Sequence, residues 1–511
     1  MKILKYIVII VSTTLFLSSC DDFLNQKPSK NTSLVPTTAD QLEYLLNNYA
    51  NFYQEGNRTS VYSTDDYGLQ KEMYDARAAA YGVVAAQFGT WDTEFLPFDG
   101  RENFWSGEYR KIFTANMVLN TLPNVSGTED QKKRLTSEAY FIRAYSYWTL
   151  AQTYCLPYTP ANKDELGLVL KQSTSFEEPV ERATLEETYA LIEADLTEAL
   201  KNTTKLEMVN NKYKSWRASK ASVNAFAARY YLNRNDYTKA LTHADVAITE
   251  HSVMMDYNVD MRYSSIISNV TVGGVPTRIW YPYTHDNQSD FTDMLEWKEH
   301  YYFRMLYHES WWYIPSTQLL ALYDQTYDLR YKYHMVKNYS FDRGLTSPVY
   351  EYPGYIFFFK DRIPSGPTVA EMLLIKAECL ARQNKVPEAM SAVNLLRAKR
   401  MDKNAPSAVI NLSATSKDDA IAKILQERRR ELPFTQRWND IRRLNSNEDA
   451  GDDVGALTRS FYGFTSAAIS PSLGLNTYTL PKNSRRYAAP IPNTEIQSSN
   501  RVSLGRSRDL L

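Results

Sequence analysis

The sequence predicts an all-α protein whose helices pack in pairs. Glycine is scarce, with 18 in 511 residues, which is about half of the usual ~7% and disfavours a turn-rich β architecture. The segment 137–157, SEAYFIRAYSYWTLAQTYCLP, carries small and large residues at helical spacing around most of its circumference, as in a helix packed on two sides. Two helix–turn–helix segments later in the chain also resemble each other.

The first residues predict export and lipidation. Two lysines precede an apolar stretch, 7–17, that is too short to span a bilayer, and Cys20 follows it closely. This order resembles a bacterial lipoprotein signal, with removal of residues 1–19 and several acyl chains on Cys20 as a stable anchor. An ordinary signal peptide with an incidental cysteine is the alternative. Asp21 and Asp22 resemble the acidic export signal of surface lipoproteins, so we expect the chain to face the cell exterior.

After this signal, irregular and helical parts alternate. Thr38 is a candidate N-cap for a short helix through Tyr49. The stretch 57–100 breaks into short aromatic pieces, which is typical of loop-rich regions that carry binding. Regular helical spacing resumes at 105–119, just before the helix of 137–157.

Three further helices are predicted in the middle of the chain. Thr184 and Glu187 have the spacing of a capping box at the start of a helix that runs to Leu200. Helical spacing then covers 217–233 and 237–248, which are separated by a tight turn.

Internal similarity indicates repeated helix pairs. AARYYLNRNDYTKALTHA, from Ala227, aligns at a constant offset with KAECLARQNKVPEAMSAV, from Lys376, so that Asn235 meets Asn384. Both segments read as helix, short polar turn and helix, which is the plan of tetratricopeptide repeats. The alternative is that any two amphipathic hairpins align this well, but the other helix pairs in the chain favour repeats. Their wide spacing argues against a continuous solenoid.

Charged residues on the predicted helices are interpreted as structural. Arg143 lies in the middle of the helix of 137–157, where we expect a buried carboxylate to receive it. Glu431, Arg437, Asp440 and Arg443 stand close together in sequence and are expected to form ion pairs that tie helices together. A site for an acidic substrate or phosphate is the alternative for this run.

Taken together, four segments resemble the SusD/RagB family of outer-membrane nutrient-binding lipoproteins. They are EAYFIRAYSYWTLAQTYCLP, EMLLIKAECLARQNKVPEAMSAVNLLRAKR, ILQERRRELPFTQRWNDIRRL and APIPNTEI. The resemblance implies an all-α fold with a tetratricopeptide-like scaffold and a loop-rich variable half that binds ligand. It also implies a partner, a TonB-dependent SusC-like transporter, over which the lipoprotein sits as a lid.

The resemblance also implies a division of the chain. It predicts a signal peptide, 1–19, and a single domain, 20–511, with the scaffold mainly in 105–250 and 367–445 and the variable parts in 57–100 and 251–366. The sequence departs from the family pattern at two places. Cys155 stands where the family usually has glycine, and Thr435-Gln436 replaces the usual Glu-Gly, so local turn geometry is expected to differ there.

Catalysis, metal binding and cofactor binding have no support in the sequence. The six histidines lack the spacing of metal ligands, and no nucleophile elbow, phosphate loop or dinucleotide fingerprint is present. Net charge is −1, which gives no field that would favour nucleic acid. The three cysteines form no even disulfide framework, and Cys155 and Cys379 are expected to be buried on helices.

Aromatic residues are the candidate ligand contacts. The chain has 38 Tyr and 9 Trp, and many lie in the interruption 251–367, where only 315–330 has clear helical periodicity. Sugar rings stack on flat aromatic faces, and neighbouring polar groups can bind their hydroxyls. The candidate contacts in irregular segments are Trp91, Trp297, Tyr302, Trp311 and Trp312.

These observations predict a lipid-anchored surface protein that binds a glycan and delivers it to the transporter, with no bond made or broken. The alternative for the aromatic residues is packing within loops. The alternative for the whole protein is a helical-repeat lipoprotein that binds protein or peptide and acts as a transporter lid.

Overall fold

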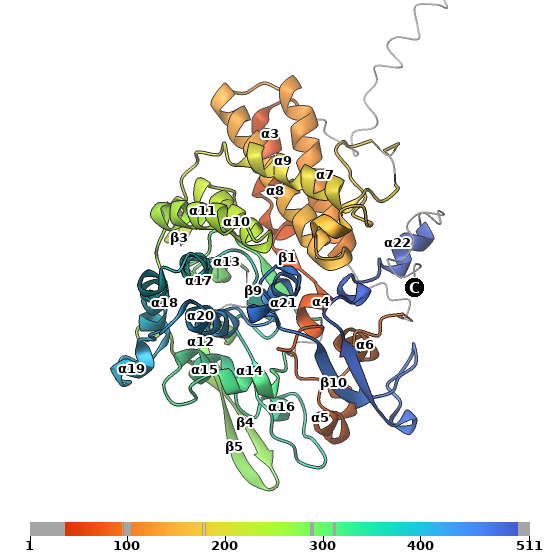
Figure 1. Ribbon diagram of the computed structural model, residues 1–511, viewed down its shortest axis with the longest axis vertical. Helices are drawn as coiled ribbons and strands as arrows, with labels where there is room; N and C mark the ends of the chain where they lie inside the picture. The colour runs from red at the N-terminus through yellow and green to blue at the C-terminus, as the bar shows by residue number, and fades with distance from the viewer. Residues whose placement is uncertain are drawn as a thin grey trace, which may run out of the picture.

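Helices are the main regular elements of the molecule, and most of its strands are short (Figure 1). The computed structural model describes residues 36–94, 96, 104–175, 177–178, 180–286, 291–309 and 313–498. The longer helices are α3 (Ala39–Asn47), α7 (Phe104–Thr121), α8 (Glu129–Tyr154), α9 (Leu185–Ala199), α10 (Lys220–Asn233), α11 (Tyr237–Glu250), α17 (Val369–Arg382), α18 (Val386–Arg400), α20 (Lys417–Glu431) and α21 (Arg437–Ser446). The all-α prediction is confirmed.

Short elements fill the regions between these helices. The short helices are α4 (Arg58–Tyr62), α5 (Lys71–Ala76), α6 (Val83–Gly89), α12 (Tyr283–Asp286), α13 (Phe291–Met294), α14 (Thr317–Leu322), α15 (Leu329–His334), α16 (Tyr339–Asp342), α19 (Ser407–Ile410) and α22 (Asn493–Ser498). The strands are β1 (Gln54–Glu55), β2 (Met208–Val209), β3 (Lys212–Tyr213), β4 (Tyr263–Val272), β5 (Val275–Pro282), β6 (Met305–Tyr307), β7 (Met335–Val336), β8 (Gly354–Tyr355), β9 (Arg362–Pro364), β10 (Leu457–Tyr462) and β11 (Leu475–Leu480).

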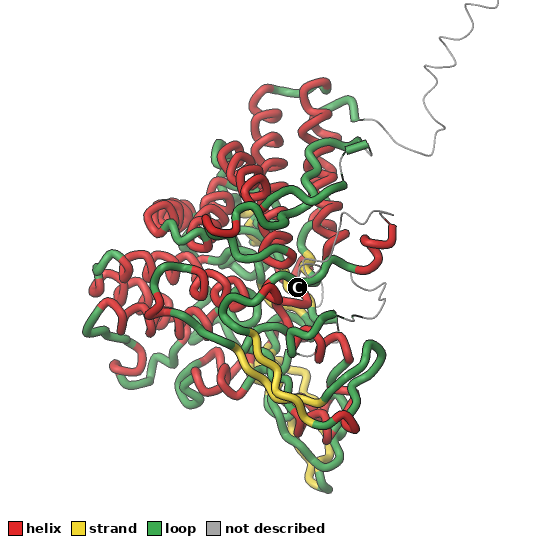
Figure 2. Tube along the Cα trace, turned by 45° about the vertical axis from the view of Figure 1, so that its right-hand side comes forward, coloured by secondary structure: helices red, strands yellow, loops and turns green. Residues whose placement is uncertain are grey.

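Helices that follow one another pack side by side and form the scaffold. α7 packs on α8, α8 on α9, α10 on α11 and α17 on α18. α11 also packs on α17, so two hairpins that are far apart in sequence are neighbours in space (Figure 1). The longest strands, β4, β5, β10 and β11, lie in the lower part of the molecule as drawn (Figures 1 and 2).

α8 contains most of the helix predicted from the segment 137–157, and it is buried over most of its length. Ala139, Ala144 and Ala151 are fully buried, which lets neighbouring helices approach closely. Arg143 donates from Nη2 to Oδ1 of Asp195 on α9 at 2.7 Å. The expected internal carboxylate partner is therefore confirmed.

The aligned hairpins α10–α11 and α17–α18 have the same turn. Asn235 (φ 58°) and Asn384 (φ 61°) both take the left-handed conformation, which asparagine tolerates better than most residues. In both turns the next amide donates to a carbonyl five residues back, Asp236 to Tyr231 and Lys385 to Leu380, each at 2.9 Å. The predicted correspondence of Asn235 and Asn384 is confirmed in the backbone geometry.

Both predicted N-caps and both predicted buried cysteines are present in the structure. Thr184 and Glu187 form the predicted capping box, and Thr38 caps α3. Cys155 and Cys379 are buried and free. The piece 315–330 differs from the prediction, because the helix α14 ends at Leu322 and a turn separates it from α15.

The structure also contains a long β-hairpin that helical periodicity did not predict. β4 and β5 pair antiparallel, and Gly273 and Gly274 form the turn with φ 54° and 83°. Positive φ at both central residues suits the tight hairpin turns that match strand twist. The β-branched residues that flank these glycines favour strands over helix.

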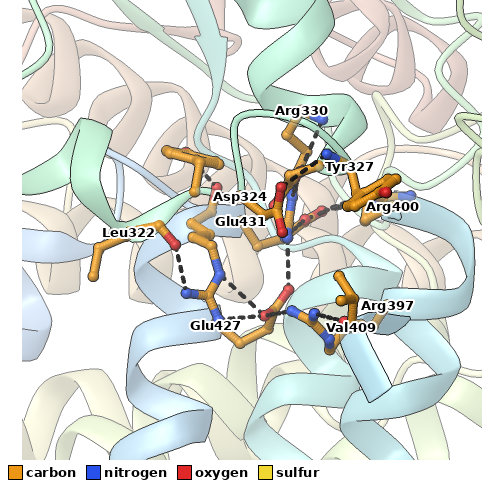
Figure 3. A network of polar contacts seen from close by, with 12 residues as sticks. Leu322, Asp324, Tyr327, Arg330, Arg397, Arg400, Val409, Glu427 and Glu431 are labelled. Atoms are coloured by element: carbon orange, nitrogen blue, oxygen red, sulfur yellow. Dashed lines mark hydrogen bonds and ion pairs between the residues drawn. The ribbon is translucent and has the colours of Figure 1, made fainter. Parts of the chain in front are cut away.

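The charged run on α20 is a buried network of ion pairs (Figure 3). Glu427 accepts from Arg330, Arg397 and Arg430, with Nη2 of Arg330 at 2.7 Å from Oε1. Glu431 accepts from Arg400 at 2.9 Å. Burial raises the pKa of the Glu427 carboxyl, but the three guanidiniums outweigh the effect of burial and hold this pKa well below its usual range.

The remaining members of the run also have structural partners. Asp440 accepts from Arg428 at 2.9 Å, Arg443 donates to Glu378 at 2.7 Å, and Arg437 donates to Asp65 at 2.7 Å. The prediction that this run ties helices together is confirmed.

We expect Asn384→Ala to lower the free energy of unfolding by about 1 kcal/mol, because alanine lacks the short polar side chain that helps asparagine adopt a left-handed backbone. Asn384→Gly is the matched variant, because glycine adopts positive φ without strain. Urea unfolding measures both. Equal stability of the alanine and glycine variants would contradict the assigned role of this turn.

Acid should weaken the scaffold through Glu378. Burial raises the pKa of this carboxyl, but Arg443 and Arg382 outweigh it and lower the pKa to about 2, from an ordinary 4.5. Because the folded-state pKa is depressed, the stabilisation is present above the unfolded pKa and is lost as the pH falls from 4.5 toward 2. We expect a loss of up to about 3 kcal/mol over that window.

Urea unfolding at pH 7, 4 and 3 measures this effect. Glu378→Gln should lower stability at pH 7 and flatten the pH dependence. Glu198→Gln is the control, because Glu198 forms an exposed pair with Lys201 and such pairs contribute little. The same pH slope in wild type and Glu378→Gln would exclude Glu378 as a source of acid sensitivity.

Candidate ligand-binding face

Three of the predicted contact residues lie in the interior. Trp91, Trp297 and Tyr302 are 2%, 3% and 3% exposed. The indole of Trp91 donates to the carbonyl of Ser63 at 2.9 Å. The ring of Tyr302 packs edge-on against Phe141, with ring centroids 4.8 Å apart. Direct contact of these three rings with a ligand stays a prediction, and their packing gives each of them a structural role.

Trp297 shows most clearly why such rings are buried. It packs against Tyr257, Phe357 and Phe358, with ring centroids 6.1, 4.9 and 5.6 Å apart. Edge-on aromatic packing of this kind stabilises a core that has no regular secondary structure around it. Trp311 and Trp312 lie outside the described residues.

A small three-stranded sheet ends where the loop regions meet. Its strand order is β1-β6-β9, with β1 parallel to β6 and β6 antiparallel to β9. Tyr307 at the end of β6 is the register partner of Arg362 at the start of β9. The chain continues from Tyr307 to Glu309, so the end of this sheet presents side chains from β6 and β9 together.

Glu309 is held by α4. Arg58 donates to Oε2 of Glu309 from Nη2 at 2.8 Å and from Nε at 3.1 Å, and the hydroxyl of Tyr62 donates to Oε1 at 3.2 Å. The side chain of Glu309 is 30% exposed. Two donors from one short helix therefore fix a carboxylate that solvent can still reach.

α4 is itself anchored to the scaffold. The side chain of Asn57 caps α4 by accepting from the amide of Ser60, and its Nδ2 donates to Oγ1 of Thr153 on α8 at 2.8 Å. The position of Arg58 thus depends on α8, which is buried over most of its length.

The other side of the face is aromatic and cationic. The guanidinium carbon of Arg362 lies 6.0 Å from the ring centroid of Tyr307 and 5.5 Å from that of Phe359. Burial raises the pKa of Tyr307, and Asp361 raises it further. Burial also raises the pKa of Asp361. Arg58, Tyr307, Glu309, Phe359 and Arg362 are called the candidate face below.

The candidate face lies where separate loop segments converge. The amide of Phe359 donates to the carbonyl of Thr284 on α12 at 3.0 Å, and the Trp91 indole reaches Ser63, just after α4. Partly exposed rings beside the Arg362 guanidinium can stack on sugar C–H faces, and the Glu309 carboxylate can bind hydroxyl groups.

The residues Arg58, Glu309 and Arg362 were missed in the sequence. Arg58 and Glu309 are 251 positions apart, and no local spacing connects them. Their pairing depends on the fold alone, so a single sequence carries no pattern that would have identified it.

In the described part of the chain, no group of three or more His, Cys, Asp or Glu is arranged so that it could hold a metal ion. Burial lowers the pKa of His300, His308 and His334 to about 3, which keeps these side chains neutral. Among the described residues, no helix combines the length and apolar composition that crossing a bilayer would need.

The fold and the candidate face define a class of protein in which a tetratricopeptide-like helical scaffold holds a face built from loops. Comparison with known families agrees with this class. A family model described as "Starch-binding associating with outer membrane" matches residues 22–232, and one described as "SusD family" matches 369–503. Together the two matches take in more than half of the chain. The chain belongs to the SusD/RagB family.

Two curated relatives are also described as SusD-like proteins. SusD-like protein P2 of Formosa agariphila is 24% identical over 442 residues, 78% of each chain. SusD-like protein P38 of the same organism is 25% identical over 419 residues, covering 70% of this chain and 74% of that protein. Both alignments extend over most of the chain.

The fold is shared with solved structures. A SusD-like carbohydrate binding protein from Bacteroides vulgatus has a TM-score of 0.60 at 17% identity, covering 93% of this chain and 100% of its own. A SusD superfamily protein from Bacteroides thetaiotaomicron has a TM-score of 0.59 at 17% identity, with 91% and 98% covered.

Proposed function

We propose that this protein is a lipoprotein of the outer membrane that faces the cell exterior, binds a glycan and delivers it to a TonB-dependent SusC-like transporter. Membership of the SusD/RagB family is the observation that carries the proposal. The similar structure from Bacteroides vulgatus is described as a carbohydrate binding protein, which supports a glycan as the ligand. The proposal includes no chemical step, so the glycan is passed on unchanged.

The candidate face supplies the chemistry that a glycan requires. Glu309 offers a carboxylate that is 30% exposed and is held by Arg58, and Arg362 offers a guanidinium beside the rings of Tyr307 and Phe359. Charged groups form the stronger hydrogen bonds to hydroxyls. Rigid rings lose little entropy on binding.

Trp311 and Trp312 complete the proposed contact set. They directly follow Glu309 and Ser310 in sequence, and Glu309 is held by α4. Trp91, Trp297 and Tyr302 would then support the binding loops from within, because they are enclosed by other rings and by backbone.

Cys20 is the proposed point of attachment to the membrane, and it lies outside the described residues. Several acyl chains on one cysteine give stable anchoring, whereas one chain binds only marginally. This anchor would keep the chain beside a transporter in the same membrane.

We expect replacement of Trp311 and Trp312 by alanine to weaken glycan binding by tenfold or more, since loss of a stacked ring costs about 1–1.5 kcal/mol. Arg58→Gln should weaken binding less, because Glu309 keeps the donor from Tyr62. Isothermal titration of residues 21–511 against panels of host and plant oligosaccharides measures this.

Tyr44→Ala is the matched control, because Tyr44 is 73% exposed on α3. The thermal midpoints of all variants should stay together. Unchanged affinity in the double tryptophan variant would remove these rings from the site. No binding to any glycan, with transporter binding retained, would favour the protein-binding or peptide-binding lid.

We expect Cys20→Ser to move the protein from the outer-membrane fraction to a soluble fraction, because the substitution removes the thiol that accepts lipid. Detergent phase partitioning and labelling with a palmitate analogue measure the anchor. Tyr44→Ala is the control, since it leaves both the thiol and the acidic export signal in place. A serine variant that remained in the membrane fraction would contradict lipid attachment at Cys20.

A further inference from the structure

The β4–β5 hairpin projects from the end of the molecule opposite the α7–α8 turn (Figure 1). Figure 2 shows the same projection from another side. The two strands pair over most of their length, with Trp280 opposite Ile267 and Arg278 opposite Asn269. Trp280, Arg278 and Asn269 therefore lie on one face of the hairpin, since side chains alternate along a strand.

Three aromatic rings, two on this hairpin and one on α15, form a surface. The ring centroid of Tyr263 lies 5.6 Å from that of Trp280 and 5.3 Å from that of Tyr333, a residue of α15. The hydroxyl of Tyr263 donates to the carbonyl of Lys332 at 3.0 Å, which fixes the ring against α15. Tyr263, Trp280 and Tyr333, with Arg278 and Lys332, are called the hairpin platform.

The hairpin platform differs from the aromatic clusters of the interior in its exposure. Trp280 is 43% exposed and Tyr263 is 37% exposed, whereas Trp91, Trp297 and Trp438 are 3% exposed or less. A large ring is usually enclosed in a folded protein, and a cluster of exposed rings is typical of a contact surface.

The platform is also cationic. The guanidinium carbon of Arg278 lies 5.7 Å from the ring centroid of Trp280, and Nζ of Lys332 lies 5.2 Å from that of Tyr333. Within the described residues, neither cation forms a salt bridge. The segments 261–285 and 329–341 contain no Asp or Glu. A positive charge beside each outer ring is therefore not neutralised by the hairpin or by α15.

We infer that the hairpin platform binds an acidic saccharide, a sugar that carries a carboxylate or a sulfate. The sugar ring stacks on Trp280 and Tyr263, and its anionic group pairs with Arg278 or Lys332. Guanidinium groups match carboxylate and sulfate oxygens in two-point contacts. Asn269 lies opposite Arg278 and can bind a hydroxyl.

This inference rests on the proposed function and adds a second contact surface, which shares no residue with the candidate face, and the chemical class of the glycan. A neutral sugar would stack but would leave the cations unused. An acidic peptide would pair with the cations but would leave the ring faces unused. The joint presence of flat rings and unneutralised cations favours a ligand with both properties.

The test uses residues 21–511 and defined probes. Oligogalacturonate carries carboxylates, heparin-derived hexasaccharide carries sulfates, maltoheptaose is neutral, and hexaglutamate has charge without a sugar ring. Titration calorimetry gives affinity. Acrylamide quenching of tryptophan fluorescence, compared between wild type and Trp280→Ala, reports burial of Trp280, because the other tryptophans are common to both proteins.

We expect at least one acidic oligosaccharide to bind and to protect Trp280 from acrylamide. Trp280→Ala and Arg278→Gln should each weaken that binding by about tenfold, the effect of losing a desolvated stacking or charged contact. Higher salt should lower the affinity for the acidic oligosaccharide more in wild type than in Arg278→Gln. Tyr44→Ala and Lys205→Ala are the matched controls, and both should bind as wild type. Thermal midpoints check that every variant is folded.

Each outcome has a defined meaning. Preference for oligogalacturonate or for the heparin fragment identifies the anionic group. Equal affinity of wild type and Trp280→Ala for every acidic oligosaccharide would overturn the inference. Hexaglutamate binding as tightly as the saccharides would also overturn it. Binding of maltoheptaose alone would overturn the inference and leave the proposed function standing, whereas no glycan binding at all would remove both.

Discussion

Buried arginines, neutralised by carboxylates from other helices, determine how the scaffold is arranged. Arg229 of α10 pairs with Glu371 of α17, and Arg443 of α21 pairs with Glu378 of α17. Taking a guanidinium out of water costs several kcal/mol, and the partner mostly offsets that cost, so the net stabilisation is small. The effect on geometry is large, because any displaced helix would leave a buried charge without its partner.

The same chemistry extends from the scaffold to the loops. Arg437 at the start of α21 donates to Asp65, and Arg429 on α20 donates to Asp66. Arg459 on β10 donates to the carbonyls of Tyr62 and Gly89, at the ends of α4 and α6. The chain around α4 is therefore fixed by helices whose own positions are fixed by ion pairs. A face built on loops can in this way be held as firmly as one built on helices.

How far the sequence predicts this structure depends on whether a feature is local. Helical spacing, the cap at Thr184 and the matching Asn235 and Asn384 are local, and the structure confirms them. The contact of Arg58 with Glu309 spans 251 positions and leaves no local pattern. The β4–β5 hairpin is an intermediate case, since Gly273-Gly274 between β-branched residues is a strand–turn–strand pattern that helical periodicity does not detect.

The aromatic residues show why composition alone cannot identify a binding site. In this fold many rings fill the space between short, irregular elements, where regular helices cannot supply the packing. Trp297 is an example, because three other rings enclose it. An aromatic residue in a loop is thus ambiguous in sequence, and its exposure decides between core and contact. By that criterion Trp280, which lies beside an unneutralised arginine, is more informative about the ligand than the buried tryptophans.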